Sequence, residues 1–256
     1  SEQGHDVVMS PGTHCYFDHY QGPMNSEPKA WGGFSPVSKV YQFDPIVDSM
    51  TEEQITHVLG GQANLWAEYV TTSSHSEYMI YPRLAALSEA LWSPKPKKSW
   101  GNFSNRMVNL FDRFDYMDIN YAKSAYTITT KTKVSEGNII TVALENEFSE
   151  SDIRYALDDE SLDASATPFT KPIEINKTTT VKASLFKNEK PIGKIFEETF
   201  TYHKAVGKTV TYNIPYSNSY KGVGANNMNN IIRGTKNFHD GQWQAWLNKD
   251  MELTID

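Results

Sequence analysis

The sequence has little of what marks several functional classes. It contains one cysteine, Cys15, among 256 residues, which excludes an intrachain disulfide and a cysteine-based zinc site. With 24 Lys and Arg against 31 Asp and Glu, a formal charge of −7, it lacks the basic surface typical of nucleic-acid binding. No apolar run approaches the roughly 18 residues of a membrane span. The histidines His14, His19, His57 and His75 are scattered, so we expect no metal site and no cofactor.

What is present is a composition that can bury a core, with 39% apolar residues. In residues 1–121 the apolar spacing predicts short strands at residues 7–9 and 57–66. It predicts helical segments or helix starts at residues 44–47, 51–55, 76–92 and 107–114, with a kink at Pro82. Strands alternating with helices indicate an α/β fold with a parallel sheet.

The pattern changes after residue 121. Residues 122–203 predict a small Ig-like β-sandwich, because short β-rich runs are bounded by Gly, Asn, Asp, Pro or Lys. These runs lie at residues 126–129, 139–144, 153–157, 179–186 and 196–202. Residues 204–256 are polar and rich in Asn, Gly and aromatic residues, and we expect them to be the opening of a longer β domain, because about 50 residues bury little core alone.

Two aromatic–acid pairs follow the two predicted strands of the first block. Tyr16 and Asp18 come after the first strand, and Trp66 and Glu68 come after the second. The ends of parallel strands meet at one edge, and a spacing of two residues points both side chains the same way in extended backbone. Such a rim suits a sugar, whose C–H faces pack on aromatic rings. The other interpretation is that the aromatics belong to the core and the acids are solvated.

Three motifs in this block closely resemble the end of the catalytic barrel in β-N-acetylhexosaminidases, the glycoside hydrolases of family 20. The motifs are residues 10–18, 59–69 and 77–93, and the resemblance covers about residues 4–121. It implies that the first block is the C-terminal portion of a (β/α)₈ TIM barrel. The family removes terminal β-linked N-acetylglucosamine or N-acetylgalactosamine by substrate-assisted, retaining catalysis, in which the sugar's own acetamido oxygen attacks C1.

The resemblance also implies roles for the four side chains. Tyr16 matches the catalytic tyrosine that hydrogen-bonds the acetamido oxygen and orients it for attack. Asp18 and Glu68 match acids that hold hydroxyls of the terminal sugar. Trp66 matches one wall of the aromatic pocket around the acetamido group.

One part of the family's machinery is missing from the first block. The family has an adjacent Asp-Glu pair, whose Glu is the general acid, on an earlier strand of the barrel. The adjacent pair in this sequence, Asp159-Glu160, follows a strand of the second block, where we expect a turn. A TIM barrel typically needs about 250 residues, and the first block supplies its last two units.

The later blocks resemble accessory domains. Residues 122–203 resemble the chitobiase-type C-terminal β-domain, and residues 204–256 resemble a truncated discoidin-like carbohydrate-binding domain. Two hypotheses follow: part of a hexosaminidase that is active only with the missing N-terminal part of the same enzyme, or a non-catalytic glycan-binding or interaction fragment. Expected partners are N-acetylglucosamine- or N-acetylgalactosamine-terminated glycans, without nucleic acid or a membrane span. We expect the parent protein in the periplasm or outside the cell.

Overall fold

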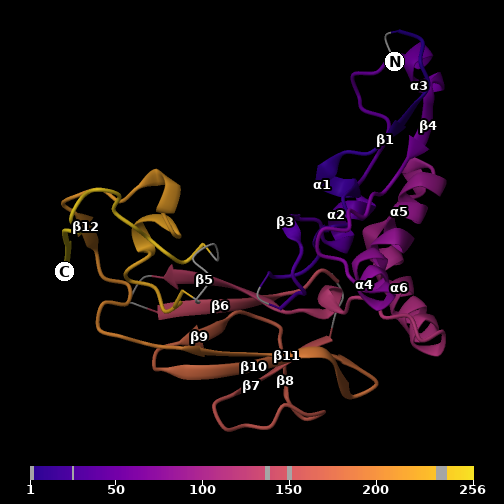
Figure 1. The fold of residues 1–256 in the computed structure, drawn as a ribbon. Helices are drawn as coiled ribbons and strands as arrows, with labels where there is room; N and C mark the ends of the chain where they lie inside the picture. Colours follow the sequence, from indigo (N-terminus) through magenta and orange to yellow (C-terminus); the bar gives the residue numbers. More distant parts are fainter. Residues whose placement is uncertain (1–2, 25, 136–138, 149–151, 235–240) are drawn as a thin grey trace. The chain divides into compact units, whose positions relative to one another are not determined.

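The chain folds into two compact units. A computed structural model describes residues 3–24, 26–135, 139–148, 152–234 and 241–256. The first unit is Ser1–Thr127 with Asn146–Ser151, and the second is Ile128–Glu145 with Asp152–Asp256. Helices dominate the first unit and strands the second (Figure 1). The structure therefore shows an α/β part followed by an all-β part.

The first unit alternates short strands and helices. Its elements are β1 (Val7–Met9), α1 (Gly12–Cys15), β2 (His19–Tyr20), β3 (Trp31–Phe34), α2 (Val37–Tyr41), α3 (Glu52–Thr56), β4 (Val58–Gly61), α4 (Ser73–Ile80), α5 (Arg83–Trp92), η1 (Lys95–Lys97), α6 (Trp100–Tyr116) and η2 (Ser124–Tyr126). None of the described helices is long and apolar enough to cross a membrane.

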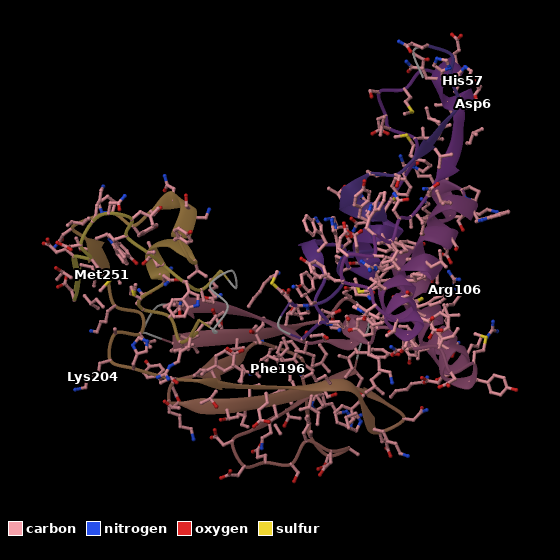
Figure 2. The ribbon with its side chains drawn as sticks, viewed as in Figure 1. Asp6, His57, Arg106, Phe196, Lys204 and Met251 are labelled. Atoms are coloured by element: carbon pink, nitrogen blue, oxygen red, sulfur yellow. The ribbon has the colours of Figure 1, made fainter. Side chains whose placement is uncertain are left out.

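Strands β1 and β4 form a parallel pair, as the sequence predicts. The register joins Val7 to Val58 and Met9 to Gly61. The pair is fixed where it begins, because the Val7 amide donates to the carbonyl of His57 (2.9 Å) and the His57 ring is hydrogen-bonded to Asp6 (3.0 Å). Figure 2 shows Asp6 and His57 side by side. The second strand is shorter than the predicted residues 57–66.

The predicted helix at residues 76–92 is two helices, α4 and α5, separated at Tyr81-Pro82. Proline has no amide hydrogen and cannot continue the α4 ladder, so the chain turns and starts α5 at the next residue. The Thr72 side chain caps α4 by accepting from the amide of His75 (3.1 Å). The sequence pattern placed the interruption correctly at Pro82, but it predicted a kink within one helix rather than two separate helices.

Two short helices were predicted before β4, and one of them forms. Thr51 and Gln54 make a reciprocal capping box that starts α3. The predicted helix at residues 44–47 is wrong. There the Asp44 carboxylate accepts from the amide of Ile46 (3.0 Å), and this local turn competes with the helix.

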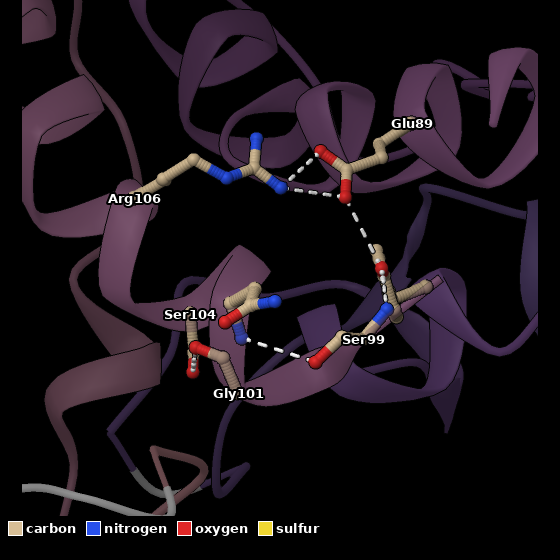
Figure 3. Close-up of polar contacts among 7 residues, drawn as sticks. Glu89, Ser99, Gly101, Ser104 and Arg106 are labelled. Carbon is tan, nitrogen blue, oxygen red and sulfur yellow. Dashed lines mark hydrogen bonds and ion pairs between the residues drawn. The ribbon is translucent and has the colours of Figure 1, made fainter. Parts of the chain in front are cut away.

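Helix α6 is held against α2 and α5 by polar contacts (Figure 3). Arg106 donates to both carboxylate oxygens of Glu89 at 2.7 Å. The hydroxyl of Tyr41 also donates to Glu89 (3.1 Å) and accepts from the amide of Ser99 (2.9 Å). The opposite, apolar face of α6 is buried at Phe103, Met107, Phe111 and Phe114, as its helical spacing predicts.

Residues 146–148 come after residues 128–145 of the second unit in the sequence, but they pack within the first unit. The side-chain amide of Asn146 donates to the carbonyls of Ala125 (2.7 Å) and Thr127 (3.0 Å). The indole of Trp100 donates to the carbonyl of Glu147 (3.0 Å), and the Phe148 ring lies beside Tyr126 with ring centroids 5.7 Å apart. These contacts anchor the Glu147 carboxylate inside the first unit.

The second unit is built from antiparallel strands. Its elements are β5 (Thr129–Ser135), β6 (Ile139–Glu145), β7 (Asp152–Leu157), β8 (Thr167–Pro168), β9 (Ile173–Ile175), β10 (Thr179–Lys187), β11 (Lys190–Phe200), β12 (Val210–Tyr212), η4 (Asn218–Tyr220), η5 (Gly224–Asn226) and β13 (Leu253–Ile255). The sheets run β5-β6-β9 and β11-β10-β7-β8, and β12 pairs with β13. The strands predicted near residues 139–144, 153–157, 179–186 and 196–202 are confirmed. The strand predicted at residues 126–129 is wrong, because residues 124–126 form η2 and β5 begins only at Thr129.

The core of the second unit follows the two-residue period of its strands. On β6 the side chains of Ile140, Val142 and Leu144 are buried and those between them are more exposed. Val181 and Ala183 of β10 are fully buried in the same way. These alternating positions give the β-rich part an apolar core of its own.

Candidate active site

The loops that follow β1 and β4 are hydrogen-bonded to each other. Tyr16 and Asn64 form an isolated parallel bridge. The amide of Phe17 donates to the carbonyl of Asn64 (2.7 Å), and the amide of Asn64 donates to the carbonyl of Cys15 (2.8 Å). This short ladder continues the β1–β4 pairing and joins the segment that carries Tyr16 to the segment that leads to Trp66.

Tyr16 and Trp66, the two predicted aromatic residues, lie together. Their ring centroids are 6.3 Å apart with the planes inclined by 59°. Trp66 is 51% exposed, and Tyr16 is half-buried. A half-exposed indole beside a tyrosine ring is a surface on which a sugar face can pack, so Trp66 is not a core aromatic.

Asp18 is buried rather than placed beside Tyr16 on an extended strand. The amide of His19 donates to the carbonyl of Tyr16 (3.3 Å), so residues 16–19 form a turn and the expected extended backbone is wrong here. Asp18 is 5% exposed, and among the described residues its Oδ1 atom has no hydrogen-bond partner. An unpaired buried acceptor is costly, and a donor from a ligand would satisfy it.

Glu68 differs from Asp18. Its side chain is exposed, and no hydrogen bond or ion pair joins it to another residue in the described part of the chain. The structure therefore brings Tyr16, Trp66 and the Asp18 turn together, while Glu68 lies exposed in the loop after β4.

A second aromatic surface was missed by the sequence reasoning. Trp31, at the start of β3, is 54% exposed and stacks on Tyr69, with ring centroids 6.4 Å apart and planes 23° from parallel. The ammonium of Lys29 lies 4.3 Å from the centroid of the Tyr69 ring. Trp31 precedes Gly32 and Gly33 and fits neither a helical nor a strand period, and this was the available signal that it is not a core residue.

Arg83 was also missed, although it lies within one of the motifs. Its side chain is 0% exposed. Its nitrogens donate to the carbonyls of Phe17 (2.5 Å), His19 (3.0 Å), Ser35 (3.3 Å) and Met79 (2.5 and 3.2 Å). The guanidinium also lies 4.7 Å from the centroid of the Phe17 ring. Arg83 thus joins the start of α5 to the turn that carries Asp18.

Several carboxylates supply the negative charge around Arg83. Burial lowers the pKa of Arg83 to about 9, while Glu27 and then Asp18 act to raise it, so the guanidinium stays charged at neutral pH. Glu27 accepts from Ser124 (2.5 Å) and Tyr78 (3.0 Å), and burial raises its pKa. Burial also raises the pKa of Glu147 to about 7, although the Ser38 amide and Arg83 act to lower it.

The Asp159-Glu160 pair lies in an exposed turn after β7, as expected. Glu160 accepts a hydrogen bond from the amide of Leu157 (3.0 Å), which closes the turn. Asp158 before it has φ of 51°, a turn conformation. The Asp159-Glu160 pair is therefore explained by its place in this turn. Among the described residues, no group of three or more His, Cys, Asp or Glu side chains could hold a metal ion.

Comparisons with known proteins find similarity over part of the chain. Residues 1–95 match the family model "Glycosyl hydrolase family 20, catalytic domain", and residues 142–200 match "Fn3 associated". The chain is 35% identical over 196 residues to a beta-hexosaminidase of Porphyromonas gingivalis, covering 71% of this chain and 24% of that protein. It is 34% identical over 119 residues to a chitooligosaccharidolytic beta-N-acetylglucosaminidase of Ostrinia furnacalis, covering 46% and 19%.

A solved structure gives a similar but partial match. The family 20 exo beta-N-acetylglucosaminidase of Vibrio harveyi, in complex with N-acetylglucosamine, aligns with 48% of this chain and 20% of its own at 30% identity and a TM-score of 0.43. The chain thus spans about a quarter or less of these relatives. Residues 1–95 are similar to part of the catalytic domain of glycosyl hydrolase family 20.

Proposed function

We propose that this chain is part of a β-N-acetylhexosaminidase that removes terminal β-linked N-acetylhexosamines, and that residues 1–121 are the C-terminal part of its catalytic barrel. The observation that carries the proposal is the Tyr16–Trp66 aromatic pair next to a turn whose buried Asp18 carboxylate has an unpaired oxygen. Aromatic rings pack on the apolar faces of a sugar, and a buried carboxylate accepts from its hydroxyls. The family 20 match over residues 1–95 supports the same assignment.

The proposed chemistry uses the substrate's own nucleophile. The acetamido oxygen attacks C1 as the bond from C1 to the leaving-group oxygen breaks and the general acid protonates that oxygen. Water then attacks C1 and releases the acetamido oxygen, so the configuration at C1 is retained. Tyr16 donates to that oxygen and holds it in line, Trp66 forms a wall of the acetamido pocket, and Asp18 and Glu68 bind sugar hydroxyls. Positioning of this kind is a large part of the rate of an intramolecular attack.

The proposed partner is the preceding part of the same barrel, which brings the general acid. Parallel sheets are normally covered on both faces, yet Val8 on β1 is 51% exposed and Leu59 on β4 is 67% exposed. These side chains fit an interface with further strands and helices. Asp159 and Glu160 are excluded as the acid pair in this proposal, since they close an exposed turn.

We also propose the finer identity of the β-rich part and the location of the parent protein. The two antiparallel sheets and the "Fn3 associated" match over residues 142–200 support a chitobiase-type, Ig-like domain, and the β12–β13 pair begins a discoidin-like segment. Appended domains of this kind suit an enzyme acting on exported glycans, in the periplasm or outside the cell. Fractionation of cells producing the parent protein tests this, and a purely cytosolic enzyme would contradict it.

The deciding experiment compares the chain alone with the chain joined to the rest of its barrel, using an aryl β-N-acetylglucosaminide. The chain alone should show no turnover, because general acid–base catalysis contributes about 10²–10⁴-fold and most of the pocket is elsewhere. The joined protein should hydrolyse the substrate. An Asp159→Asn, Glu160→Gln variant is the control and should match the parent in both forms. Binding of the sugar without hydrolysis by the joined protein would favour a glycan-binding fragment instead.

A further inference from the structure

The positive charge of Arg83 has no role in the proposed chemistry. It is fully buried, and burying an arginine is expensive unless its donors are all satisfied. Every nitrogen of the guanidinium donates, and every acceptor is a backbone carbonyl. The side chain therefore fixes the positions of the backbone carbonyls that accept its hydrogen bonds.

Two of the carbonyls that accept from Arg83 flank Asp18. One Nη atom donates to the carbonyl of Phe17 and the other to the carbonyl of His19. The carbonyl of Asp18 itself accepts from the amide of Trp31 (3.0 Å). All three successive carbonyls of the turn are thereby fixed, and the backbone that orients the Asp18 side chain has little freedom.

The same cation balances the Asp18 carboxylate. The carboxylates of Glu27 and Asp18 act to raise the pKa of Arg83, against the lowering effect of burial. The two side chains form no hydrogen bond, so the attraction leaves the Oδ1 atom of Asp18 open. A direct ion pair would occupy that oxygen, whereas this arrangement keeps it available.

Resting on the proposed function, we propose that Arg83 is a positioning residue for sugar recognition, which fixes the Asp18 turn so that the open carboxylate oxygen meets a hydroxyl of the terminal N-acetylhexosamine. Arg83 does not contact the sugar. Lysine cannot replace it, because one ammonium cannot reach carbonyls on both sides of the turn in a planar fork. A merely structural Arg83 would affect how much protein folds but not which sugar is preferred.

The test is a double-mutant cycle in the chain joined to the rest of its barrel. Arg83→Lys, Asp18→Asn and the double variant are compared by kcat and KM on aryl β-N-acetylglucosaminide and aryl β-N-acetylgalactosaminide, which differ in the orientation of one hydroxyl. Each single variant should lower kcat/KM by about 10- to 100-fold, the range for a hydrogen bond to a charged group. Both should shift the ratio between the two sugars in the same direction. The double variant should lose less than about threefold beyond the worse single variant, because coupled residues are not additive.

Several outcomes overturn the assignment. If the losses in kcat/KM of the two single variants multiply in the double variant, Arg83 is merely structural. The same follows if Arg83→Lys lowers kcat but leaves KM and the ratio between the two sugars unchanged. A wild-type protein inactive on both sugars would instead refute the proposed function, and this inference with it. Arg106→Lys is the matched control, since its ion pair with Glu89 joins α6 to α5, and it should match the parent. If Arg83→Lys does not fold, Phe17→Leu, which removes the ring 4.7 Å from the guanidinium, takes its place in the cycle with the same criteria.

Discussion

The parallel pair β1–β4 and the antiparallel strand β6 bury their apolar residues to very different extents. On the parallel pair, Val8 is 51% exposed and Leu59 67% exposed, whereas Ile140 and Val142 of β6 are 0% exposed. Both regions read as apolar strands in the sequence. The antiparallel sheets of the second unit enclose a core by themselves, while a parallel pair needs covering layers on both faces. The difference supports the proposal that the first unit is part of a larger barrel and that its exposed residues belong to an interface.

The largest expected effect lies at the site in the first unit. In the protein joined to the rest of its barrel, Tyr16→Phe should lower kcat by about 10²–10³-fold, because one hydrogen bond to a developing charge is lost. Steady-state kinetics on an aryl β-N-acetylglucosaminide measure it. Tyr116→Phe, at a side chain that is 92% exposed, is the control and should change nothing. Equal, unchanged kcat values in both folded variants would refute the role of Tyr16.

The next effect tests whether the second unit has the self-sufficient core. Ile140→Ala should reduce the free energy of unfolding of that unit by about 2–5 kcal/mol, since a fully buried aliphatic side chain leaves a cavity. Leu59→Ala in the isolated chain should cost less than about 0.5 kcal/mol, because that side chain is already exposed. Urea unfolding followed by circular dichroism compares them. Similar costs at the two positions would remove the contrast between the units.

The sequence predicts the second unit better than the first for a physical reason. Antiparallel strands such as β6, β7 and β10 are specified locally by their two-residue alternation and flanking turns, and they form where predicted. The resemblance identified Tyr16 and Trp66, and the structure brings their rings together. The break at Pro82 and the apolar face of α6 are equally local.

What the sequence did not predict depends on long-range contacts. Arg83 is separated by more than sixty residues from Phe17, and nothing in its own neighbourhood indicates that its charge is buried. The Asp18 turn is held by that contact, so extended backbone was the wrong expectation. Asp44 was assigned to a helix start, and its side chain instead closes a local turn with Ile46. The stacking of Trp31, at the start of β3, on Tyr69, in the loop after β4, is likewise a contact between residues far apart in the sequence.

A smaller effect is expected from pH and concerns the first unit alone. Burial raises the pKa of Glu147 from 4.5 to about 7, so the folded state holds this proton more tightly than the unfolded state. The contribution of Glu147 to stability should therefore be fully present below about pH 4.5 and be lost as the pH rises through 7. This loss lowers the free energy of unfolding by roughly 1–3 kcal/mol. Glu147→Gln should flatten that fall in urea unfolding at pH 5 and pH 8. Glu27, whose pKa is also raised, should leave some slope, and an unchanged slope would refute the assignment to Glu147.

The smallest effect compares one ion pair from each unit. Glu89 is 18% exposed where it receives Arg106, and a second donor, Tyr41, holds it in place (Figure 3). In the second unit Lys131 and Glu145 are 74% and 42% exposed. Screening and side-chain entropy leave exposed pairs worth about 0.2–1 kcal/mol, and a preorganised, partly buried partner lies at the upper end. Arg106→Gln should therefore cost about 1 kcal/mol and Lys131→Gln less than about 0.5 kcal/mol in urea unfolding. Raising the ionic strength to about 1 M should abolish the second cost before the first, because salt screens the exposed pair more; equal costs at both salt levels would show that the network around Glu89 adds nothing.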